Sequence, residues 1–494
     1  MRPSPCGSFA SAILYTSQVA RNQITPILMA NSRRDHKPEL HTDVVVIGGG
    51  LAGLAAANHL AKAGLHVICL EPREAFKNIV GESLDWSAPQ LFAELGLTMD
   101  DLVESGAATF KRHITVTTVD GAQKEYLPGE WLTKRPWNVE VRTLHLDRQQ
   151  IHTLLQESAL RNGVTTRYER ATGFELQDRH IAAVETSAGH SIRTSWVVDA
   201  SGAAASVLGK QFNLPSSVYG PRKVALWGHF PTEDWVEGTT LYTLSPAGEY
   251  MEWLWEIPIR PGISSIGYVA PGSVVKLERS RGLSNADILA MQMHRFDHLR
   301  AIVQQDPPER VASTSFLCRT YKGVCGPNWI VMGEAASQSD PITGNGVTAA
   351  LRHAAEGSAL IRRYEDRGTI PVLDRTAYNM RVSGMGRYFN SLIEKFYYLS
   401  PIRVRLGLFG TAEAYTVPAW LTNLIYSRTR PRRLLGTLIF CSALFSIRGA
   451  AWCLFQICNL FDRKPSGNRQ IDRHTPKALA RVDEREEQRH ALQS

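Results

Sequence analysis

Two tryptophans, Trp253 and Trp255, stand one residue apart in a run of the form WxWxIP that ends at Pro258. Side chains two residues apart on a strand point to the same face of its sheet, so both indoles are expected on one face. Large aromatic side chains can line an active site, but they more often form hydrophobic core. The residue types alone favour core, and the motifs around the pair must decide.

A lysine adds a second group that could do chemistry. Lys111 lies in the run Thr-Phe-Lys-Arg. A lysine in a desolvated neighbourhood has a lowered pKa, and its free amine is nucleophilic. The competing interpretation is a solvent-facing strand lysine, since three other lysines lie nearby in the sequence: Lys77, Lys124 and Lys134.

A glycine-rich turn follows the first expected strand, 43–47, whose continuous apolar run is typical of a buried parallel strand. Gly48 permits the tight turn, Gly50 lets the backbone approach a pyrophosphate, and Gly53 lets the following helix, 54–63, pack closely on the sheet. A carboxylate at the end of the next strand, 66–70, can accept hydrogen bonds from both ribose hydroxyls. These features predict that a dinucleotide, FAD or NAD, is bound by Gly48, Gly50, Leu51, Ala52, Gly53 and Glu71.

Three later segments favour FAD. With the glycine turn they resemble the FAD-dependent aromatic monooxygenase superfamily and its flavin-dependent halogenase branch, in which distant parts of the chain wrap the flavin. Segment 146–151 opens a helix and resembles one whose arginine, here Arg148, lies near the FAD. Segment 196–202 resembles the Asp-Ala-Ser-Gly closure of the FAD domain. An ordinary helix start and an ordinary strand-to-loop junction would look similar in these two places.

The third segment, 329–347, resembles the GDAA…DPxxxxG region of that superfamily. The resemblance implies that an acidic residue holds the ribityl chain and that a glycine-containing turn starts a helix under the isoalloxazine ring. Backbone N–H groups at such a turn can hold negative charge on flavin carbonyls, a peroxide or a halide. Glu334 stands where Asp is usual, one methylene longer, which leaves the ribityl contact open. The residues so implied are Gly333, Glu334, Pro341, Gly344, Asn345 and Gly346.

The halogenase resemblance gives catalytic roles to Trp253, Trp255 and Lys111. The paired tryptophans are similar to a screen that keeps the organic substrate from the flavin, so that a flavin hydroperoxide meets halide instead of carbon. The resulting hypohalous acid then passes to a lysine, which binds or captures it beside the substrate. In the family this lysine follows a Gly-Glu-Ala or Gly-Glu-Ser helix start, and here Gly81-Glu82-Ser83 precedes Lys111.

One departure from the family concerns the turn after Pro341. Tryptophan halogenases carry a Glu-Ser pair there, whose glutamate assists aromatic substitution, but Thr343 and Gly344 occupy the matching positions. Neither residue can act as a general base, which argues against free tryptophan as the substrate. The Thr-Gly-Asn-Gly turn looks more like hydroxylase, epoxidase and isoprenoid-reductase relatives.

We therefore expect an FAD-dependent oxidoreductase that activates O2 as a flavin hydroperoxide and halogenates an electron-rich aromatic substrate through hypohalous acid. Hydroxylation or epoxidation by the same intermediate, and an isoprenoid-type flavin reductase acting on a lipophilic substrate, stay open as alternatives. The expected partners are halide, O2, a flavin reductase or NAD(P)H as electron source, and a small-molecule substrate that is lipidic or carrier-bound. The sequence indicates neither a metal site nor a nucleic-acid interface.

These motifs require an α/β fold in which a discontinuous Rossmann-like FAD-binding domain positions the flavin. Alternating apolar and polar stretches, such as 224–230, 239–244 and 264–269, predict an antiparallel-sheet substrate domain that carries the tryptophan pair. A C-terminal helical region follows. The expected division is 41–111 with 141–215 and 311–370 for FAD, 112–140 with 216–310 for substrate, and 371–463 for the helical region.

Composition sets wider limits. A chain of 494 residues with 44% hydrophobic content can bury an enzyme-sized core. Its net charge of +8 comes largely from arginine clusters at 33–34 and 428–433, which favours an anionic partner surface at the ends. Seven scattered cysteines do not form a disulfide framework, and Cys318 with Cys325 lacks a second pair at zinc-ligand spacing. A reducing, cytoplasmic compartment is expected.

The two ends of the chain are the least regular parts. Residues 1–40 look a little like a transit peptide, but a flexible extension, with Met29 as an alternative start, is the simpler interpretation. Apolar runs at 434–447 and 449–461 are each too short to span a bilayer, so 434–461 is expected to be a peripheral or monotopic membrane anchor. A buried helical pair is the alternative. The polar tail 464–494 is expected to be disordered.

Overall fold

The computed structural model describes residues 39–398 with some gaps, of which 127–142 is the longest, and a few isolated positions between 431 and 442. The shorter gaps are 77–79, 86–87, 204–205, 234–236, 245–249 and 308–309. The predicted extension 1–40 lies outside the described residues except for Glu39 and Leu40, which already belong to a strand. The predicted anchor 434–461 lies outside them except for isolated positions, and the predicted tail 464–494 lies outside entirely.

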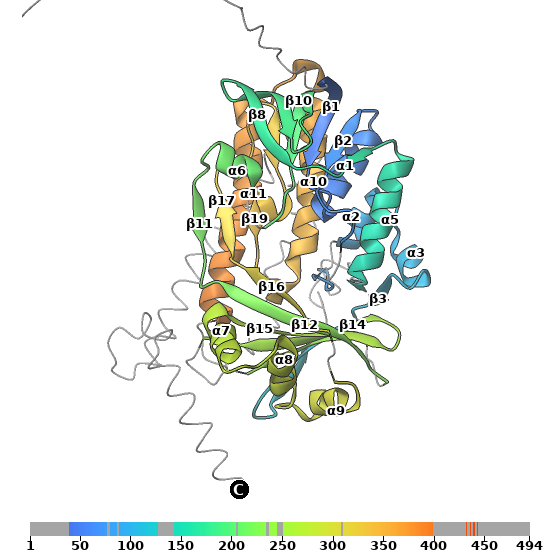
Figure 1. Ribbon diagram of the computed structural model, residues 1–494, viewed down its shortest axis with the longest axis vertical. Helices are drawn as coiled ribbons and strands as arrows, with labels where there is room; N and C mark the ends of the chain where they lie inside the picture. Colours follow the sequence, from blue (N-terminus) through green and yellow to red (C-terminus); the bar gives the residue numbers. More distant parts are fainter. Residues whose placement is uncertain are drawn as a thin grey trace, which may run out of the picture. The chain divides into compact units, whose positions relative to one another are not determined.

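Parallel strands at the centre of the first sheet carry the early sequence motifs (Figure 1). Strand β1 pairs in parallel with β2 and β10, and its residues 44–47 are buried. A strand buried on both faces reads as a continuous apolar run, as this one does. The described strands, in sheet order, are β7 (Thr165–Arg167), β2 (Val67–Leu70), β1 (Glu39–Ile47), β10 (Ser191–Asp199), β9 (His180–Thr186) and β8 (Ala171–Gln177), with β18 (Trp329–Val331) parallel to β10.

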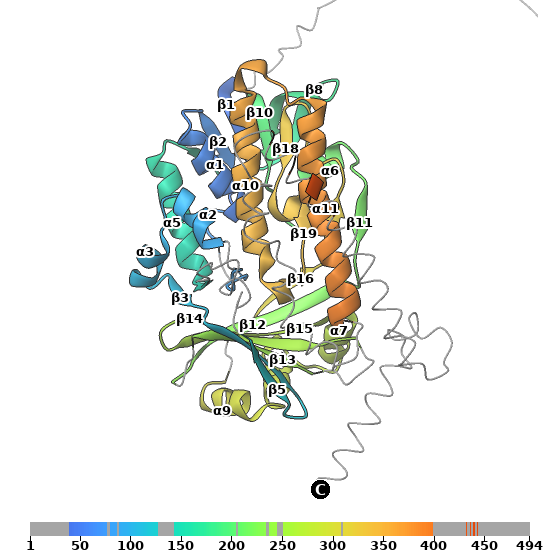
Figure 2. The same cartoon turned by 180° about the vertical axis from the view of Figure 1, so that it is seen from behind.

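Helix α1 (Leu51–Ala61) packs against α10 (Asn345–Arg363) and α5 (Arg148–Arg161), beside this sheet (Figure 2). Small buried residues, Ala55–Ala57, let these helices approach closely. The sequence predicted a helix over 54–63, but α1 begins earlier, so its first turn belongs to the glycine motif itself. The other described α-helices of this region are α2 (Ala88–Glu94), α3 (Met99–Glu104), α6 (Val207–Gln211) and α11 (Val372–Leu392).

The second sheet carries the tryptophan pair on its strand β14. It is antiparallel, as predicted, except that β4 runs parallel to β13. Alternating hydrophobicity reveals a strand but not its direction, which depends on the connection between distant segments. The described strands, in sheet order, are β16 (Ala312–Phe316), β12 (Lys223–Pro231), β15 (Ile263–Pro271), β14 (Trp253–Arg260), β13 (Gly238–Thr243), β4 (His113–Thr118) and β5 (Gln123–Tyr126).

The two faces of this second sheet have different partners. One face buries Leu226, Ile266 and Tyr268 against α7 (Gly272–Ser280), α8 (Asn285–Met293) and α9 (Asp297–Gln305). The opposite face buries both tryptophans with Ile342 and Tyr398, which come from the later flavin motif and the C-terminal helix. The alternation expected of a strand thus sends the WxW pair toward the motif residues.

Short elements complete the described architecture. Two small sheets join β3 (Ala108–Phe110) to β6 (Leu144–Leu146), and β11 (Ser216–Val218) to β17 (Arg319–Tyr321) and β19 (Ser337–Gln338). Single turns of 3-10 helix are η1 (Gly333–Ala335), η2 (Pro341–Thr343) and η3 (Glu365–Arg367), and a π-helical turn, η4 (Ile393–Tyr398), follows α11. Within the described part of the chain, no helix combines the length and apolar character needed to cross a bilayer.

Candidate active site

The turn between β1 and α1 has the geometry of a phosphate-binding loop. Gly48 adopts a φ of +103°, and a Cβ atom on Gly53 would lie 1.8 Å from the Gly48 carbonyl oxygen. A Cβ on Gly50 would meet no atom within 4 Å. Gly50 caps α1 without a side-chain hydrogen bond, so the first N–H groups of the helix face that open space. Open space and unused donors fit the pyrophosphate of a dinucleotide.

Glu71, predicted to bind the ribose, follows β2 beside this turn and is 3% exposed. Its Oε2 accepts a hydrogen bond from the Gly49 N–H at 2.8 Å, and its Oε1 is 2.7 Å from the Nε of Arg73. Burial alone would raise the pKa of this carboxyl, but hydrogen bonds from Arg73 and Gly49 outweigh burial and lower the pKa. The carboxylate is therefore ionised, and each of its oxygens already accepts two hydrogen bonds from Gly49 and Arg73. A ribose hydroxyl would have to take the place of a contact from Arg73, whose side chain is 58% exposed.

Arg148 and Glu334 lie in one enclosed region. The Glu334 residue is accessible to solvent, but protein atoms surround its carboxyl group. This enclosure raises the pKa of the carboxyl, and the charge of Arg148 opposes the rise. An accessible side chain enclosed by protein lines a cavity. The Arg148 Nη1 donates to the Gly81 carbonyl at 3.1 Å, whereas its buried Nε has no hydrogen-bond partner among the described residues. An unpaired buried donor is costly, so this one fits a site that a bound group completes.

Gly333 brings the later motif against the first. It has a φ of +59°, and a Cβ on it would lie 2.8 Å from the Cβ of Ala52 in α1. Its N–H donates to the Nδ1 of buried His353 at 3.1 Å. The two segments that the sequence assigned to one cofactor therefore touch each other.

The turn at 340–346 offers a second set of donors. The Asp340 carboxylate accepts from the Ile342 N–H at 3.1 Å and caps η2. Gly344 then adopts a φ of +64° and caps α10 without a side-chain hydrogen bond, and a Cβ on Gly346 would meet no atom within 4 Å. Pro341 is exposed, and Asn345 is partly exposed. This helix start can hold a negative charge.

The two tryptophans are buried and held through their ring nitrogens. Their ring centroids are 5.8 Å apart, at an interplanar angle of 50°. The Trp255 Nε1 donates to the Ser265 hydroxyl at 3.2 Å, and Ser265 donates to Glu82 Oε1 at 3.1 Å. The Trp253 Nε1 donates to the Tyr398 hydroxyl at 3.0 Å. The Trp255 indole is thus tied through Ser265 to the Gly81-Glu82-Ser83 segment, and the Trp253 indole is tied to η4.

Glu82 belongs to the Gly-Glu-Ser segment and is 3% exposed. Its Oε2 accepts from the Gly81 N–H at 3.0 Å, and burial raises the pKa of its carboxyl against the opposing effect of that hydrogen bond. Since Gly81 also accepts from Arg148, this segment connects the predicted flavin arginine with the tryptophan pair. Glu82 was part of the predicted motif, but no role for it was predicted from the sequence.

Lys111 follows β3 and is 8% exposed. Its Nζ donates to the Leu84 carbonyl at 3.2 Å. The neighbouring residue, Ser83, is the one whose carbonyl oxygen would lie 3.0 Å from a Cβ on Gly344. Lys111 is therefore not the solvent-facing strand lysine of the alternative interpretation, and residues 83–84 separate it from the turn at 340–346.

Buried His145 lies close enough to Lys111 to feel its charge. Its Nε2 is 2.8 Å from the Thr239 hydroxyl, and its Nδ1 has no partner among the described residues. Burial, reinforced by the charge of Lys111, lowers the pKa of His145 well below its usual value. A neutral imidazole beside the lysine avoids a second buried positive charge.

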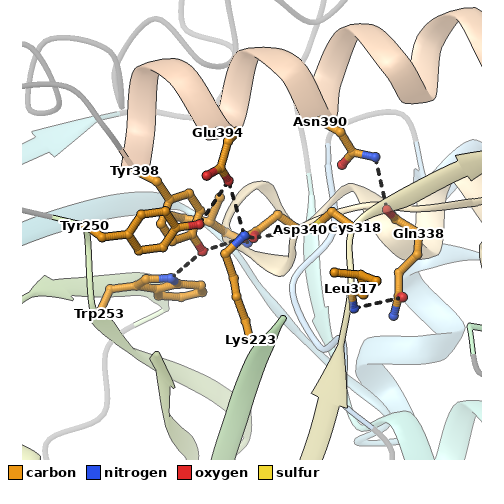
Figure 3. Close-up of polar contacts among 11 residues, drawn as sticks. Lys223, Tyr250, Trp253, Leu317, Cys318, Gln338, Asp340, Asn390, Glu394 and Tyr398 are labelled. Carbon is orange, nitrogen blue, oxygen red and sulfur yellow. Dashed lines mark hydrogen bonds and ion pairs between the residues drawn. The ribbon is translucent and has the colours of Figure 1, made fainter. Parts of the chain in front are cut away.

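A buried polar cluster that was not predicted from the sequence surrounds Asp340 (Figure 3). Its further members are Lys223 at the start of β12, Tyr250, and Glu394 and Tyr398 of η4. The one available signal was a lysine at the head of an otherwise apolar strand. Its partners, 171 residues away in the case of Glu394, are not evident from sequence spacing.

Known proteins share sequence features with this chain. The family model described as tryptophan halogenase matches residues 134–403, and the one described as lycopene cyclase protein matches residues 43–220. A chlorinase of 1H-pyrrole-2-carbonyl on a peptidyl-carrier protein, from Pseudomonas fluorescens, is 25% identical over 354 residues, which are 63% of this chain and 74% of that protein. Tryptophan 2-halogenase of Chondromyces crocatus is 26% identical over 336 residues, 65% of this chain and 61% of that protein.

Solved structures share the fold. The flavin-dependent brominase Bmp2 aligns with a TM-score of 0.62 at 21% identity, over 83% of this chain and 100% of that chain. The halogenase PltM, in the form of a single-residue variant solved in complex with FAD, aligns with a TM-score of 0.63 at 16% identity, over 80% of this chain and 85% of that one.

Proposed function

The chain belongs to the tryptophan halogenase family and is an FAD-dependent halogenating oxidoreductase, and we propose that it halogenates an electron-rich aromatic ring beside Lys111. The observation that carries this proposal is the burial of Lys111 next to residues 83–84, which separate it from the open helix start at 344–346. The paired tryptophans, each held by its ring nitrogen, support a barrier near these groups.

The residues near the open space fit FAD. The turn at 48–53 would hold the pyrophosphate, Glu71 the ribose, and Arg148 with Glu334 the region toward the ribityl chain. Gly333, Pro341 and residues 344–346 would lie along the isoalloxazine ring. The chemistry that FAD supplies when bound is the activation of O2 and the oxidation of halide to hypohalous acid. Its electrons would come from a flavin reductase or from NAD(P)H.

Lys111 would then deliver the halogen. Its ammonium can hold hypohalous acid by hydrogen bonding, or its neutral amine can take the halogen, forming an N–X bond as water leaves. In either case the ring carbon attacks the halogen and afterwards loses its proton. Trp253 and Trp255 would keep the ring at Lys111 and away from the flavin.

The substrate class follows from what the turn lacks. Thr343 and Gly344 provide no carboxylate to remove the ring proton, so the ring itself must be strongly activated, as a pyrrole or a phenol is. Two relatives, a chlorinase and a brominase, act on a pyrrole carbonyl carried by a peptidyl-carrier protein. These relatives support an electron-rich aromatic substrate and a carrier-bound form of it. The bromination assay described next can compare a carrier-bound pyrrole carbonyl with the corresponding free carboxylic acid.

The test supplies the purified protein with reduced FAD, O2, bromide and a small electron-rich phenol. We expect brominated phenol from the wild type, and a loss of about 100-fold or more in Lys111→Ala, the order expected when a reacting group is removed. Lys124→Ala, at an exposed position of β5, is the control and should brominate normally. If the phenol instead gains oxygen whether or not bromide is present, the protein is a hydroxylase and this proposal is wrong.

Membrane association stays a separate proposal, which rests on the apolar runs within 434–461 and the basic cluster at 428–433. The predicted cytoplasmic location and the predicted lipidic substrate likewise stay proposals. Deletion of 434–461 should move the protein from the membrane fraction to the soluble fraction without loss of FAD binding. Loss of folded protein would favour the buried helical pair instead.

A further inference from the structure

Lys223 is buried among groups that serve the proposed site. It is 1% exposed, and its Nζ lies 3.1 Å from Asp340 Oδ2 and 3.4 Å from Glu394 Oε2. Figure 3 shows its ammonium between these carboxylates and beside the rings of Tyr250 and Tyr398, with the Tyr398 ring centroid at 4.2 Å. A buried ammonium is tolerated only where charges and hydrogen bonds compensate it, and this one is surrounded by such groups.

Within this cluster, Asp340 connects Lys223 to the turn that is proposed to lie beneath the flavin. Its Oδ2 faces Lys223, while its Oδ1 accepts from the Ile342 N–H at 3.1 Å and from the Tyr398 hydroxyl at 3.0 Å. The Ile342 contact shapes η2, and η2 leads directly into Gly344 and the uncapped start of α10. The direction in which the N–H groups of residues 345–346 point therefore depends on where Asp340 is held.

The same carboxylate also holds the tryptophan barrier. Tyr398, which donates to Asp340, accepts from the Trp253 Nε1 at 3.0 Å. On the other side of the ammonium, the Tyr250 hydroxyl donates to Glu394 Oε2 at 3.0 Å, and the Tyr250 ring stacks on that of Tyr398 with ring centroids 4.8 Å apart. Through Asp340, Lys223 is thus connected both to the turn beneath the proposed flavin and to the indole that is proposed to screen it.

We propose that Lys223 is a positioning residue of the halogenation site, which fixes Asp340 and through it both the turn at 341–346 and the indole of Trp253. This inference rests on the proposed function for its halide readout. Without the ammonium, the Asp340 carboxylate is left buried beside Glu394 with no counter-charge from the residues that the structure describes, and it must shift or take up a proton. Either response displaces the turn and loosens Tyr398.

The test compares Lys223→Met with Lys223→Arg, and uses Lys322→Met, at an exposed position just after β17, as the control. In Lys223→Met we expect the FAD Kd to rise about tenfold, the order of one displaced set of hydrogen bonds. The near-ultraviolet circular dichroism of the tryptophans should weaken. The KM for bromide should rise at least as much as the FAD Kd, and more reduced FAD should be consumed per brominated product. Lys223→Arg, which keeps the charge, should recover most of each effect.

An ion pair that only stabilises the fold predicts a different pattern. Lys223→Met would then yield less folded protein, but its FAD-bound fraction would keep the wild-type FAD Kd, bromide KM and tryptophan signal, and this result would overturn the inference. If Lys223→Met does not fold, the polar but uncharged variant Lys223→Gln decides: a bromide KM and a tryptophan signal both identical to those of the wild type would contradict positioning, because this variant leaves Asp340 without the ammonium. A wild type that binds FAD but does not brominate would refute the proposed function, while the FAD Kd and tryptophan signal would still decide the role of Lys223.

Discussion

His353 shows how a buried side chain can support the flavin-side turns without reaching a ligand. Its Nδ1 accepts from the Gly333 N–H, and burial lowers its pKa from the usual 6.5 to about 4. At neutral pH it is therefore an uncharged acceptor. Protonation would place a positive charge in a buried position and replace the acceptor by a donor that faces another N–H.

This arrangement predicts a loss of stability in mild acid. Below pH 6.5 the unfolded chain binds a proton at this histidine that the folded chain binds only near pH 4, so folding becomes less favourable as the pH falls through that window. The expected loss is about 2 kcal/mol by pH 5, since one pKa unit corresponds to about 1.4 kcal/mol.

Denaturant unfolding at pH 7 and pH 5 measures the effect of His353. His353→Asn, whose amide oxygen can replace Nδ1, should lose less stability over this interval than the wild type. His59 and His152 also have pKa values lowered to about 4, and they contribute equally to both proteins. An equal loss in the wild type and the variant would show that the Gly333 contact is not sensitive to protonation.

Trp255 gives a second prediction at the scale of one residue. Trp255→Phe removes part of the ring and the hydrogen bond to Ser265, so a barrier formed by this indole should become permeable. With a bulky phenol, bromide and O2, we expect the share of oxygenated product to rise about tenfold or more over the wild type, as expected when a positioned barrier is lost. Trp227→Phe, buried in the same face of the sheet, is the control. An unchanged product ratio would assign the pair to core packing.

Single residues could be proposed from the sequence where a motif contains them. The glycines at 48–53, Arg148 and Lys111 were identified in this way, and their roles stay predictions until tested. Lys223, Glu394 and Tyr398 were not identified, because their meaning lies in contacts across long separations, such as 58 residues between Asp340 and Tyr398. The hydrogen bond from Ser265 to Glu82 spans 183 residues. No local pattern contains such pairs.

The connection between β1 and α1 separates two roles of glycine. Gly53→Ala should prevent correct folding, because the new Cβ would lie 1.8 Å from the Gly48 carbonyl oxygen of the same turn. Gly50→Ala should fold normally, because its Cβ would meet no atom within 4 Å. The new methyl group would instead occupy the space proposed for the pyrophosphate, so the FAD Kd should rise about tenfold or more, the order of a lost charge-assisted contact.

Fluorescence titration with FAD and thermal unfolding of the cofactor-free protein separate these effects. Equal FAD affinity in Gly50→Ala and the wild type would mean that the pyrophosphate lies elsewhere.

At the scale of elements, strands were predicted better than their pairing. The stretches at 224–230, 239–244 and 264–269 lie within β12, β13 and β15 or within one residue of them. Their alternation records which face is buried, and that information is local. The parallel pairing of β4 with β13 is not local, because several other elements, including β10 and β12, lie between these two strands in the chain. The separation of residues into three FAD-domain pieces was suggested by motif resemblance, and it stays a proposal.

At the scale of the whole molecule, four distant stretches of the chain meet: 48–53, 81–83, 253–255 and 333–346. The turn at 48–53 touches Gly333, the turn at 340–346 touches Ser83, and the tryptophan strand is tied to Glu82 and Asp340. The family model spans 134–403, and the α/β fold is shared with halogenases at 16–21% identity. Motifs spread this widely along the sequence were enough to predict the fold. The contacts between them could not be predicted, because they depend on the packing of the complete chain.

The central claim is that oxidising power from O2 reaches the substrate as halogen and not as oxygen. Mass spectrometry of the product formed with reduced FAD, bromide and isotopically heavy O2 measures this directly. We predict that the aromatic product gains bromine and no heavy oxygen, and that without bromide it does not form. A product that carries heavy oxygen, in equal yield with and without bromide, would contradict the account.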